Sequence, residues 1–195
     1  MQLLRTLVIL CLFLGQSIAS AANITNENAV TPTQKNGLYV DTSNGLPING
    51  PVQLKVLDYI EKGQLSNGLK NGVWFTYDYK NRISSVVEYK LGKYNGILIN
   101  YYSSGRILDV RQYESGVLSG PWVSFYENGQ IEFKGHYKSG QKNGLFMYFY
   151  TDGSLLEEGY YKDGDRDGYW LRKYRNGQID HEISGNYYKG ERIFP

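Results

Sequence analysis

Residues 120–144, GPWVSFYENGQIEFKGHYKSGQKNG, are one unit of a repeat that recurs along most of the chain. The opening glycine returns every 24 residues, at Gly72, Gly96, Gly120, Gly144 and Gly168. Two further glycine columns keep this period: Gly105, Gly129, Gly153 and Gly177, and Gly68, Gly92, Gly116, Gly140 and Gly164. A fixed period of this length predicts an array of equivalent units stacked along one axis.

Each unit consists of two strand-like runs that are joined by a short turn. The turn is Asn128-Gly129 in the quoted unit, and the equivalent turns are Lys80-Asn81, Ser104-Gly105, Asp152-Gly153 and Asn176-Gly177. Asn-Gly or Asp-Gly between strand-like runs favours a two-residue type I′ hairpin. We therefore predict an all-β fold, an elongated single-layer antiparallel β-meander of tandem 24-residue hairpin repeats.

A two-residue turn at Asn128-Gly129 would fix the register of the whole hairpin. Counting outward from each turn predicts these cross-strand pairs: Trp122 with Gly135, Tyr126 with Ile131, Tyr101 with Leu108, Ile99 with Val110 and, in the last unit, Trp170 with Ile183. A large ring opposite a glycine is a favourable match, because the ring covers backbone that glycine leaves bare.

The repeat is expected to fill residues 48–195. A degenerate first copy at residues 50–71 lacks the aromatic columns, as expected for an end unit that meets solvent on one side. Regular copies then start at residues 72, 96, 120, 144 and 168, and residues 185–195 form a C-terminal cap. Residues 22–47 are polar, rich in Asn, Thr, Pro and Gly, and without a period, so they are predicted to be a flexible leader.

The first 21 residues have the features of a signal peptide. Arg5 is a short basic region, residues 7–14 are an apolar run too short to span a bilayer, and Ala19-Ser20-Ala21 is a small-residue cleavage site. We expect the protein to be exported to the periplasm, the cell envelope or the medium. Cys11, the single cysteine, lies inside the apolar run, so the exported protein would depend on packing without disulfides.

Charge excludes some classes of partner. The chain has 21 basic and 19 acidic residues, mixed in sign along its length, for a net charge of +2. A nucleic-acid binder needs a basic stripe to neutralise phosphates, and the sequence has none, so no nucleic-acid partner is expected. Peripheral contact with a membrane surface is likewise unsupported by charge.

The predicted register divides the side chains between a recurrent and a variable face. The recurrent face would carry a Trp/Leu/Phe column, two Tyr columns and an Ile column, represented in one unit by Trp122, Tyr126, Ile131 and Tyr137. Their recurrence predicts that they stack between hairpins as the core. The variable face is apolar in its first half, and we predict a partner-binding patch there: Phe75, Tyr77, Ile99, Tyr101, Leu108 and Val110. The alternative is that the leader or the curvature of the sheet buries this half.

Residues 161–170, YKDGDRDGYW, carry the columns Tyr-x-x-Gly-x-x-x-Gly-x-Trp. This pattern resembles the MORN repeat and, more closely, its bacterial variant, in which a Tyr-x-Asn-Gly or Tyr-x-Asp-Gly turn follows. The resemblance covers residues 62–190 and implies successive antiparallel hairpins in one twisted sheet, with a binding or scaffolding role and no catalysis. Many bacterial relatives carry an antitoxin-like label, but a signal peptide departs from what a cytoplasmic antitoxin needs.

Catalytic and metal chemistry have little support in the sequence. His136 and His181 are the two histidines, and no G-x-S-x-G nucleophile motif is present, so no catalytic residue is assigned. The run Asp163-Gly164-Asp165-Arg166-Asp167-Gly168 imitates the start of a calcium loop, but its twelfth position is Tyr174 where a bidentate Glu is required. No metal and no cofactor are expected.

The sequence therefore favours an exported, non-enzymatic repeat protein that binds an unknown protein partner or a second copy of itself. A carbohydrate or cell-wall binding module is the alternative, because arrays of Tyr and Trp can stack on sugar rings. Exposure of the Trp column discriminates between the two, since a buried column offers no platform to a sugar.

Overall fold

The computed structural model describes residues 32–194 of the chain. The predicted signal peptide and residues 22–31 of the predicted leader lie outside the described residues. Residues 32–194 form strands and turns, and they contain no helix that could cross a membrane. The predicted all-β fold of antiparallel hairpins is confirmed.

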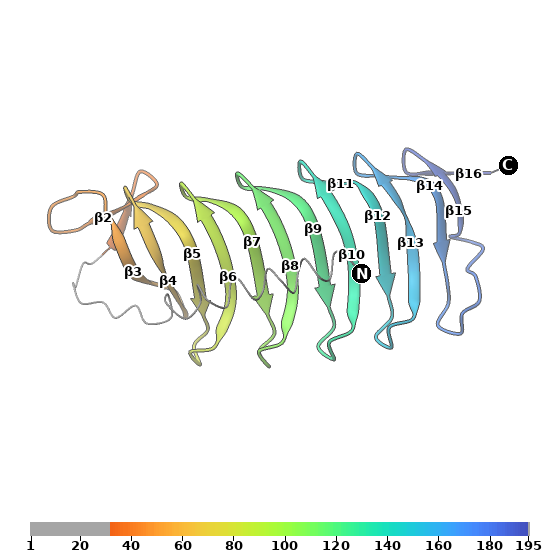
Figure 1. The fold of residues 1–195 in the computed structure, drawn as a ribbon, viewed down its shortest axis with the longest axis horizontal. Coiled ribbons are helices and arrows are strands. Elements are labelled where there is room, and N and C mark those ends of the chain that lie inside the picture. The colour runs from red at the N-terminus through yellow and green to blue at the C-terminus, as the bar shows by residue number, and fades with distance from the viewer. Residues whose placement is uncertain (1–31, 195) are drawn as a thin grey trace.

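An open antiparallel sheet of 14 strands makes up most of this fold, with neighbours in chain order. Figure 1 shows the strands side by side along the longest axis, from β3 at one end to β16 at the other. A two-residue strand, β11 (Gln141–Lys142), pairs with β10 beside β12. The other strands are β3 (Gly50–Val56), β4 (Tyr59–Ser66), β5 (Leu69–Tyr77), β6 (Ile83–Lys90), β7 (Lys93–Tyr101), β8 (Ile107–Glu114), β9 (Val117–Phe125), β10 (Ile131–Lys138), β12 (Gly144–Phe149), β13 (Leu155–Lys162), β14 (Asp165–Arg172), β15 (Gly185–Tyr188) and β16 (Glu191–Ile193).

Two kinds of turn alternate along the meander. The connections from β8 to β9 and from β10 to β11 are two-residue turns, Ser115-Gly116 and Ser139-Gly140, in which both residues have positive φ. Positive φ at both central residues defines a type I′ turn. The type I′ turns thus occupy the third glycine column and not the predicted tip at Asn128-Gly129.

The predicted tips are three-residue loops, which corrects the turn type. In the third regular unit the amide of Tyr126 donates to the carbonyl of Gln130 and the amide of Gly129 donates to the carbonyl of Tyr126, each at 2.8 Å. Gly129 has a φ of 90°, whereas Asn128 is not among the residues with positive φ. This is a type I turn that ends on a left-handed glycine, a common three-residue hairpin loop.

The extra loop residue shifts the register near each tip and leaves it intact further in. Ile131 pairs with Phe125, so the predicted Tyr126–Ile131 pair is wrong. A bulge follows, after which Trp122 pairs with Gly135 as predicted. Because a one-residue shift moves a side chain to the opposite face, the Ile column leaves the face to which the sequence assigned it.

The last hairpin departs from the period. Trp170 pairs with Gly185 and not with Ile183. Residues 181–183 form a turn, and the amide of Ser184 donates to the carbonyl of Asp180 at 2.8 Å. This turn displaces two residues from the ladder, so the strand resumes at a glycine opposite the tryptophan.

Part of the predicted flexible leader has regular structure. Strands β1 (Pro32–Lys35) and β2 (Leu38–Asp41) form a hairpin around Asn36-Gly37. The amide of Tyr39 donates to the carbonyl of Gly68 at 2.8 Å, which ties this hairpin to the large sheet. Val40 is buried, and Tyr39 packs against the core next to β3 and β4.

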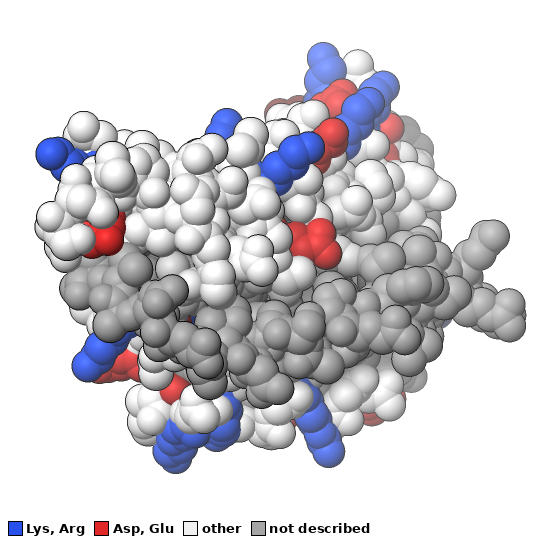
Figure 2. Space-filling model, turned by 60° about the vertical axis from the view of Figure 1, so that its left-hand side comes forward, with Lys and Arg blue, Asp and Glu red and all other residues white. Residues whose placement is uncertain are grey.

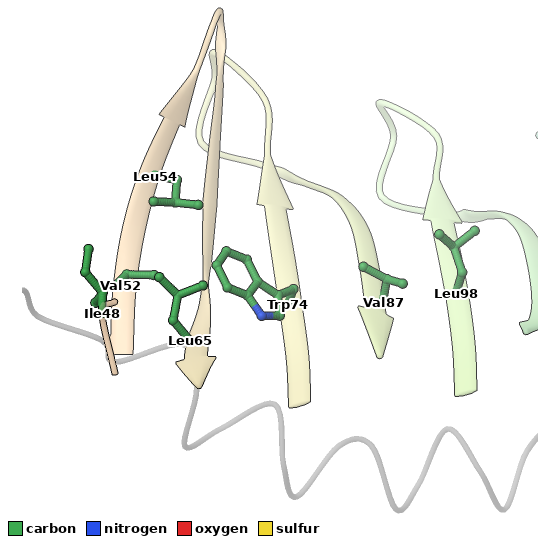
Figure 3. Packing of buried hydrophobic residues seen from close by; sticks show 7 residues of the cluster. All are labelled: Ile48, Val52, Leu54, Leu65, Trp74, Val87 and Leu98. Atoms are coloured by element: carbon green, nitrogen blue, oxygen red, sulfur yellow. The ribbon is translucent and has the colours of Figure 1, made fainter. Parts of the chain in front are cut away.

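One face of the sheet, here called the aromatic face, holds Trp74, Leu98, Trp122, Phe146 and Trp170 in successive hairpins. Figure 3 shows the core at the β3 end, where side chains from β3, β4, β5, β6 and β7 lie in one layer. A second cluster at the other end contains Tyr137, Phe146, Trp170 and Tyr187. The recurrent Trp/Leu/Phe column is thus part of the core, as predicted.

Glycine on one strand makes room for the large ring on the next strand. A Cβ added to Gly135 would lie 2.3 Å from the Phe146 ring, and one added to Gly159 would lie 2.2 Å from the Trp170 ring. Both positions belong to a column in which the copy that starts at residue 96 has Arg111. There the guanidinium lies over the ring of Trp122, 4.3 Å from its centroid, and Trp122 is only half-buried.

Candidate functional site

The face opposite the aromatic face, here called the second face, carries a straight row of apolar side chains across five neighbouring strands. The ladder pairs Phe75 with Val86, Val86 with Ile99, Ile99 with Val110 and Val110 with Val123. These five residues, here called the apolar row, run from β5 to β9 at right angles to the strands. Their exposed fractions lie between 0% for Phe75 and 7% for Val123.

A parallel line of partly buried apolar side chains borders this row toward the three-residue loops. Tyr77 pairs with Ile83, and Tyr101 pairs with Ile107. Tyr101 and Ile107 pack against the cluster of Ile99 and Val110, and Ile83 packs against the cluster that contains Phe75, Tyr77 and Val86. Thus Ile83 and Ile107 lie on the second face, which corrects the prediction that the Ile column belongs to the recurrent face.

Five of the six residues predicted from the sequence as a partner-binding patch come together here. Phe75, Ile99 and Val110 are members of the apolar row, and Tyr77 and Tyr101 border it. Leu108 is the exception, since the partner of Tyr101 is Ile107, and Leu108 is the extra residue of the bulge next to it. The sequence prediction omitted Val86 and Val123, which complete the row.

A lysine continues the apolar row at each end. Lys62 pairs with Phe75, and Lys134 pairs with Val123. The ammonium of Lys62 lies 5.1 Å from the ring centroid of Tyr77, and that of Lys134 lies 5.7 Å from the ring centroid of Phe149. Neither lysine takes part in an ion pair within residues 32–194. An apolar band thus ends, on both sides, in a positive charge without a carboxylate partner in the described part of the chain.

An open polar hollow lies beside the apolar row, on the side away from the three-residue loops. Gln112 and His136 line it from the second face, together with Lys90, Glu114 and backbone at Gly120. The row therefore has an apolar border on one long side and a polar border on the other.

On the aromatic face three cations pair with carboxylates, whereas Lys142, which lies over the Phe146 and Tyr161 rings, has no ion pair within residues 32–194. Lys70 lies 4.5 Å from the Trp74 ring centroid and forms an ion pair of 2.6 Å with Glu61. Arg166 lies 4.2 Å from the Trp170 ring centroid and forms an ion pair with Glu157. In the copy that starts at residue 96, Arg111 and Asp109 of the same strand form a pair of 2.8 Å.

Burial of the Trp column removes the platform that a carbohydrate module would need. Trp74 is 1% exposed and Trp170 is 0% exposed. Their indole N–H groups donate to the carbonyls of Gln64 and Tyr160, each at 3.0 Å. Trp122 is the half-buried member of the column, and its buried Nε1 has no acceptor within the described part of the chain.

The tip tyrosines hold neighbouring hairpins together. The hydroxyl of Tyr102 donates to the carbonyl of Phe125 at 2.7 Å, and the hydroxyl of Tyr126 donates to that of Phe149 at 2.8 Å. Tyr150 repeats the contact with the carbonyl of Lys173 at 2.9 Å. Their recurrence thus reflects a structural role between hairpins, as the sequence predicted.

The two histidines lie apart from each other. His136 is exposed on β10, where it pairs with Pro121, and His181 is exposed in the turn before β15. Within residues 32–194, no group of three or more His, Cys, Asp or Glu side chains is arranged to hold a metal ion. Figure 2 shows Lys and Arg side chains interspersed with Asp and Glu on the visible side, without a continuous basic stripe.

Comparison with known proteins identifies the repeat. Residues 118–139 and 142–163 match the family model described as the MORN repeat variant. The predicted recognition is thus confirmed, and these two adjacent units are MORN repeats of the variant type, a non-catalytic repeat that is generally found in protein-binding or membrane-binding modules. A search of curated proteins finds no match to the chain.

Two solved structures that resemble the chain do so only distantly. One is a mutant of S. aureus TarM in complex with Fondaparinux, alpha-GlcNAc-glycerol and UDP, with a TM-score of 0.32 and 3% identity over 60% of this chain and 21% of the other. The second is the GtfA/B complex bound to UDP and GlcNAc, with a TM-score of 0.29 and 10% identity over 68% of this chain and 26% of the other. This chain thus spans about a fifth to a quarter of those proteins, and the weak likeness says nothing about its own function.

Proposed function

We propose that the protein is an exported, non-enzymatic scaffolding module that binds a protein partner through the apolar row of its second face. The observation that carries this proposal is the unbroken line of apolar side chains from Phe75 to Val123 on five adjacent strands. A sheet that is apolar on a face is stable when that face is buried against another layer. The signal-peptide features of residues 1–21 support export.

The choice of face follows from how each face satisfies its own side chains. On the aromatic face, rings fill the space above glycines, and Lys70 and Arg166 pair with carboxylates of the same sheet. On the second face, the residues within 32–194 that pack on the apolar row belong to strands β4 to β9 of the same sheet. The row itself is 0–7% exposed, so a partner would contact the partly buried residues that border it, such as Tyr101 and Ile107.

A paired substitution tests this proposal. Tyr101→Glu with Ile107→Lys places opposite charges at a cross-strand pair, which is compatible with the sheet but makes the border of the row polar. The matched control is Leu145→Glu with Tyr160→Lys, a cross-strand pair of the second face outside the row whose members are 41% and 57% exposed. Circular dichroism verifies that both variants fold.

Association is then measured by light scattering and by pull-down from an envelope extract. We expect the Tyr101/Ile107 variant to lose association that the wild type and the control retain, because charged groups would have to be buried in an apolar contact. Equal association of both folded variants would overturn the proposal.

A further inference from the structure

We infer that the aromatic face holds a binding site in which Lys142 takes the carboxylate of a small organic acid with an apolar body. The site lies on the opposite face from the apolar row, so it goes beyond the proposed function and does not depend on it. The inference follows from the repeat itself, because equivalent positions in other units hold a carboxylate that the unit of Lys142 lacks.

Three cations occupy one column of the repeat on the aromatic face. Lys70, Lys142 and Arg166 are separated by multiples of the 24-residue period. Each lies over the ring four residues further along the chain, and the distance to the ring centroid is 4.5 Å for Lys70 over Trp74, 5.3 Å for Lys142 over Phe146 and 4.2 Å for Arg166 over Trp170. The three charged groups therefore reach the same part of the repeat unit.

The carboxylate that neutralises this column is missing in one unit. Two of the three cations pair with a carboxylate nine residues earlier in the chain, Lys70 with Glu61 at 2.6 Å and Arg166 with Glu157. The equivalent position for Lys142 is Phe133, and Lys142 takes part in no ion pair within residues 32–194. An aromatic ring in place of the carboxylate thus leaves this cation without a counter-charge in the described part of the chain.

Hydroxyl groups beside Lys142 supply acceptors but no negative charge. The ammonium donates to the hydroxyl oxygen of Tyr148 at 3.1 Å and to that of Tyr161 at 3.5 Å, and the two hydroxyls share a hydrogen bond with each other. Burial raises the pKa of Tyr148 above its ordinary value of 10.0, so this phenol is neutral near pH 7. An ammonium has three hydrogens and each phenol has one, so one N–H and one O–H remain without an acceptor within residues 32–194.

These two donors and the uncompensated positive charge fit the two oxygens of a carboxylate. The acid across the ladder from Tyr148 is Glu157, which is already engaged by Arg166 and Arg172. Phe133 offers an apolar neighbour to the body of the ligand, and its ring stacks on that of Tyr148 with centroids 5.8 Å apart. In contrast to the apolar row, Phe133, Lys142 and Tyr148 are all partly exposed, so a ligand can reach them.

Other lysines over aromatic rings lack this arrangement. The ammonium groups of Lys62 and Lys134 lie 5.1 Å and 5.7 Å from the nearest ring centroids, and neither donates to a hydroxyl within residues 32–194. They also lie outside the column in which other units hold an ion pair. Lys62 therefore serves as a matched control for Lys142.

The first experiment compares two probes of the same shape with the full protein. Sodium benzoate carries the carboxylate, and benzamide is its neutral counterpart. Binding is followed at constant ionic strength by NMR of the lysine ε-methylene and tyrosine ring signals. We expect benzoate to shift the signals of Lys142, Tyr148 and Tyr161 saturably and benzamide to leave them unchanged. Acetate, which lacks the apolar body, should bind at least about tenfold more weakly than benzoate.

Substitutions then separate charge from packing. Phe133→Glu restores the carboxylate that other units have, so it should pair with Lys142 and weaken benzoate binding at least about tenfold. Phe133→Gln has nearly the same shape without the charge and should weaken it less than about threefold. Lys142→Met should weaken binding at least about tenfold, whereas Lys62→Met should change it less than about twofold. Circular dichroism verifies that each variant folds.

Several results would overturn the inference: equal shifts by benzoate and benzamide, equal binding of acetate and benzoate, equal losses in Phe133→Gln and Phe133→Glu, or unchanged binding in Lys142→Met. Displacement of benzoate by an equal concentration of inorganic phosphate or sulfate would also overturn it, because the site would then not be one for carboxylates. If Phe133→Glu does not fold, the comparison of Lys142→Met with Lys62→Met decides. The proposed function is tested separately by the Tyr101/Ile107 variant on the other face, so each can fail without the other.

Discussion

Gly159→Ala is a sharp test of how the hairpins are stacked. An added Cβ would lie 2.2 Å from Cδ2 and 2.4 Å from Cε2 of Trp170, far inside van der Waals contact. The indole ring is 0% exposed and its N–H donates to the carbonyl of Tyr160 at 3.0 Å. The ring therefore has to move, and its hydrogen bond has to weaken or break.

The expected cost follows from these contacts. Forcing an extra methyl group into a well-packed core costs about 1–3 kcal/mol. Loss of a buried hydrogen bond adds about 1 kcal/mol, and the lower backbone entropy of alanine in a strand returns about 0.5–1 kcal/mol. We expect Gly159→Ala to lower the free energy of unfolding by about 2 kcal/mol, near the middle of the range that these contributions span.

The assay is urea denaturation followed by tryptophan fluorescence, repeated in a Trp170→Leu background. The β6 and β7 strands already combine a Cβ-bearing residue with leucine, as Val87 and Leu98. In that background Gly159→Ala should therefore cost less than about 1 kcal/mol, which gives a coupling of more than about 1 kcal/mol in the double-mutant cycle. Strictly additive costs, or a harmless Gly159→Ala in the wild type, would refute the stacking argument.

Three further predictions follow from the same contacts. Trp170→Ala should lower the free energy of unfolding by about 3–5 kcal/mol, and Trp122→Ala by clearly less, because Trp122 is half-buried and its indole N–H has no acceptor within residues 32–194. Tyr126→Phe should cost about 1 kcal/mol in urea denaturation, because its hydroxyl ties two hairpins together. Hydrogen bonds from Arg82 hold the pKa of Asp78 below its ordinary value of 3.8. The resulting stability is present above that value and is lost as pH falls below it, so Asp78→Asn should lower the thermal midpoint near pH 7 and match the wild type in strong acid.

The fold was accessible from the sequence because each unit repeats the same local signals. Glycine columns mark the turns, and counting from them places Trp122 opposite Gly135, as observed. The same X-Gly signal does not separate a two-residue turn from a three-residue loop, so Asn128-Gly129 was assigned the wrong turn type. The extra residue of the three-residue loop places the Ile column on the other face, since side chains alternate along a strand.

Two features were present in the sequence and were missed for different reasons. Asn36-Gly37 is a strong hairpin signal, but the polar composition of residues 22–47 suggested a leader without structure. Val123 belongs to the apolar row, but finding it requires carrying the register through a type I′ turn into the next hairpin. Counting only within each hairpin gave most residues of the patch. It did not show that they form one row across neighbouring hairpins. The direction of that line depends on pairing between hairpins.

Site-specific photocrosslinking tests the central claim most directly. Tyr101 beside the apolar row, or Tyr160 outside it on the same face, is replaced with p-benzoylphenylalanine, and the protein is irradiated in an envelope extract. The account predicts a protein adduct from position 101 that is absent from position 160. Adducts of equal yield from both positions, or the lack of an adduct from position 101, would contradict it.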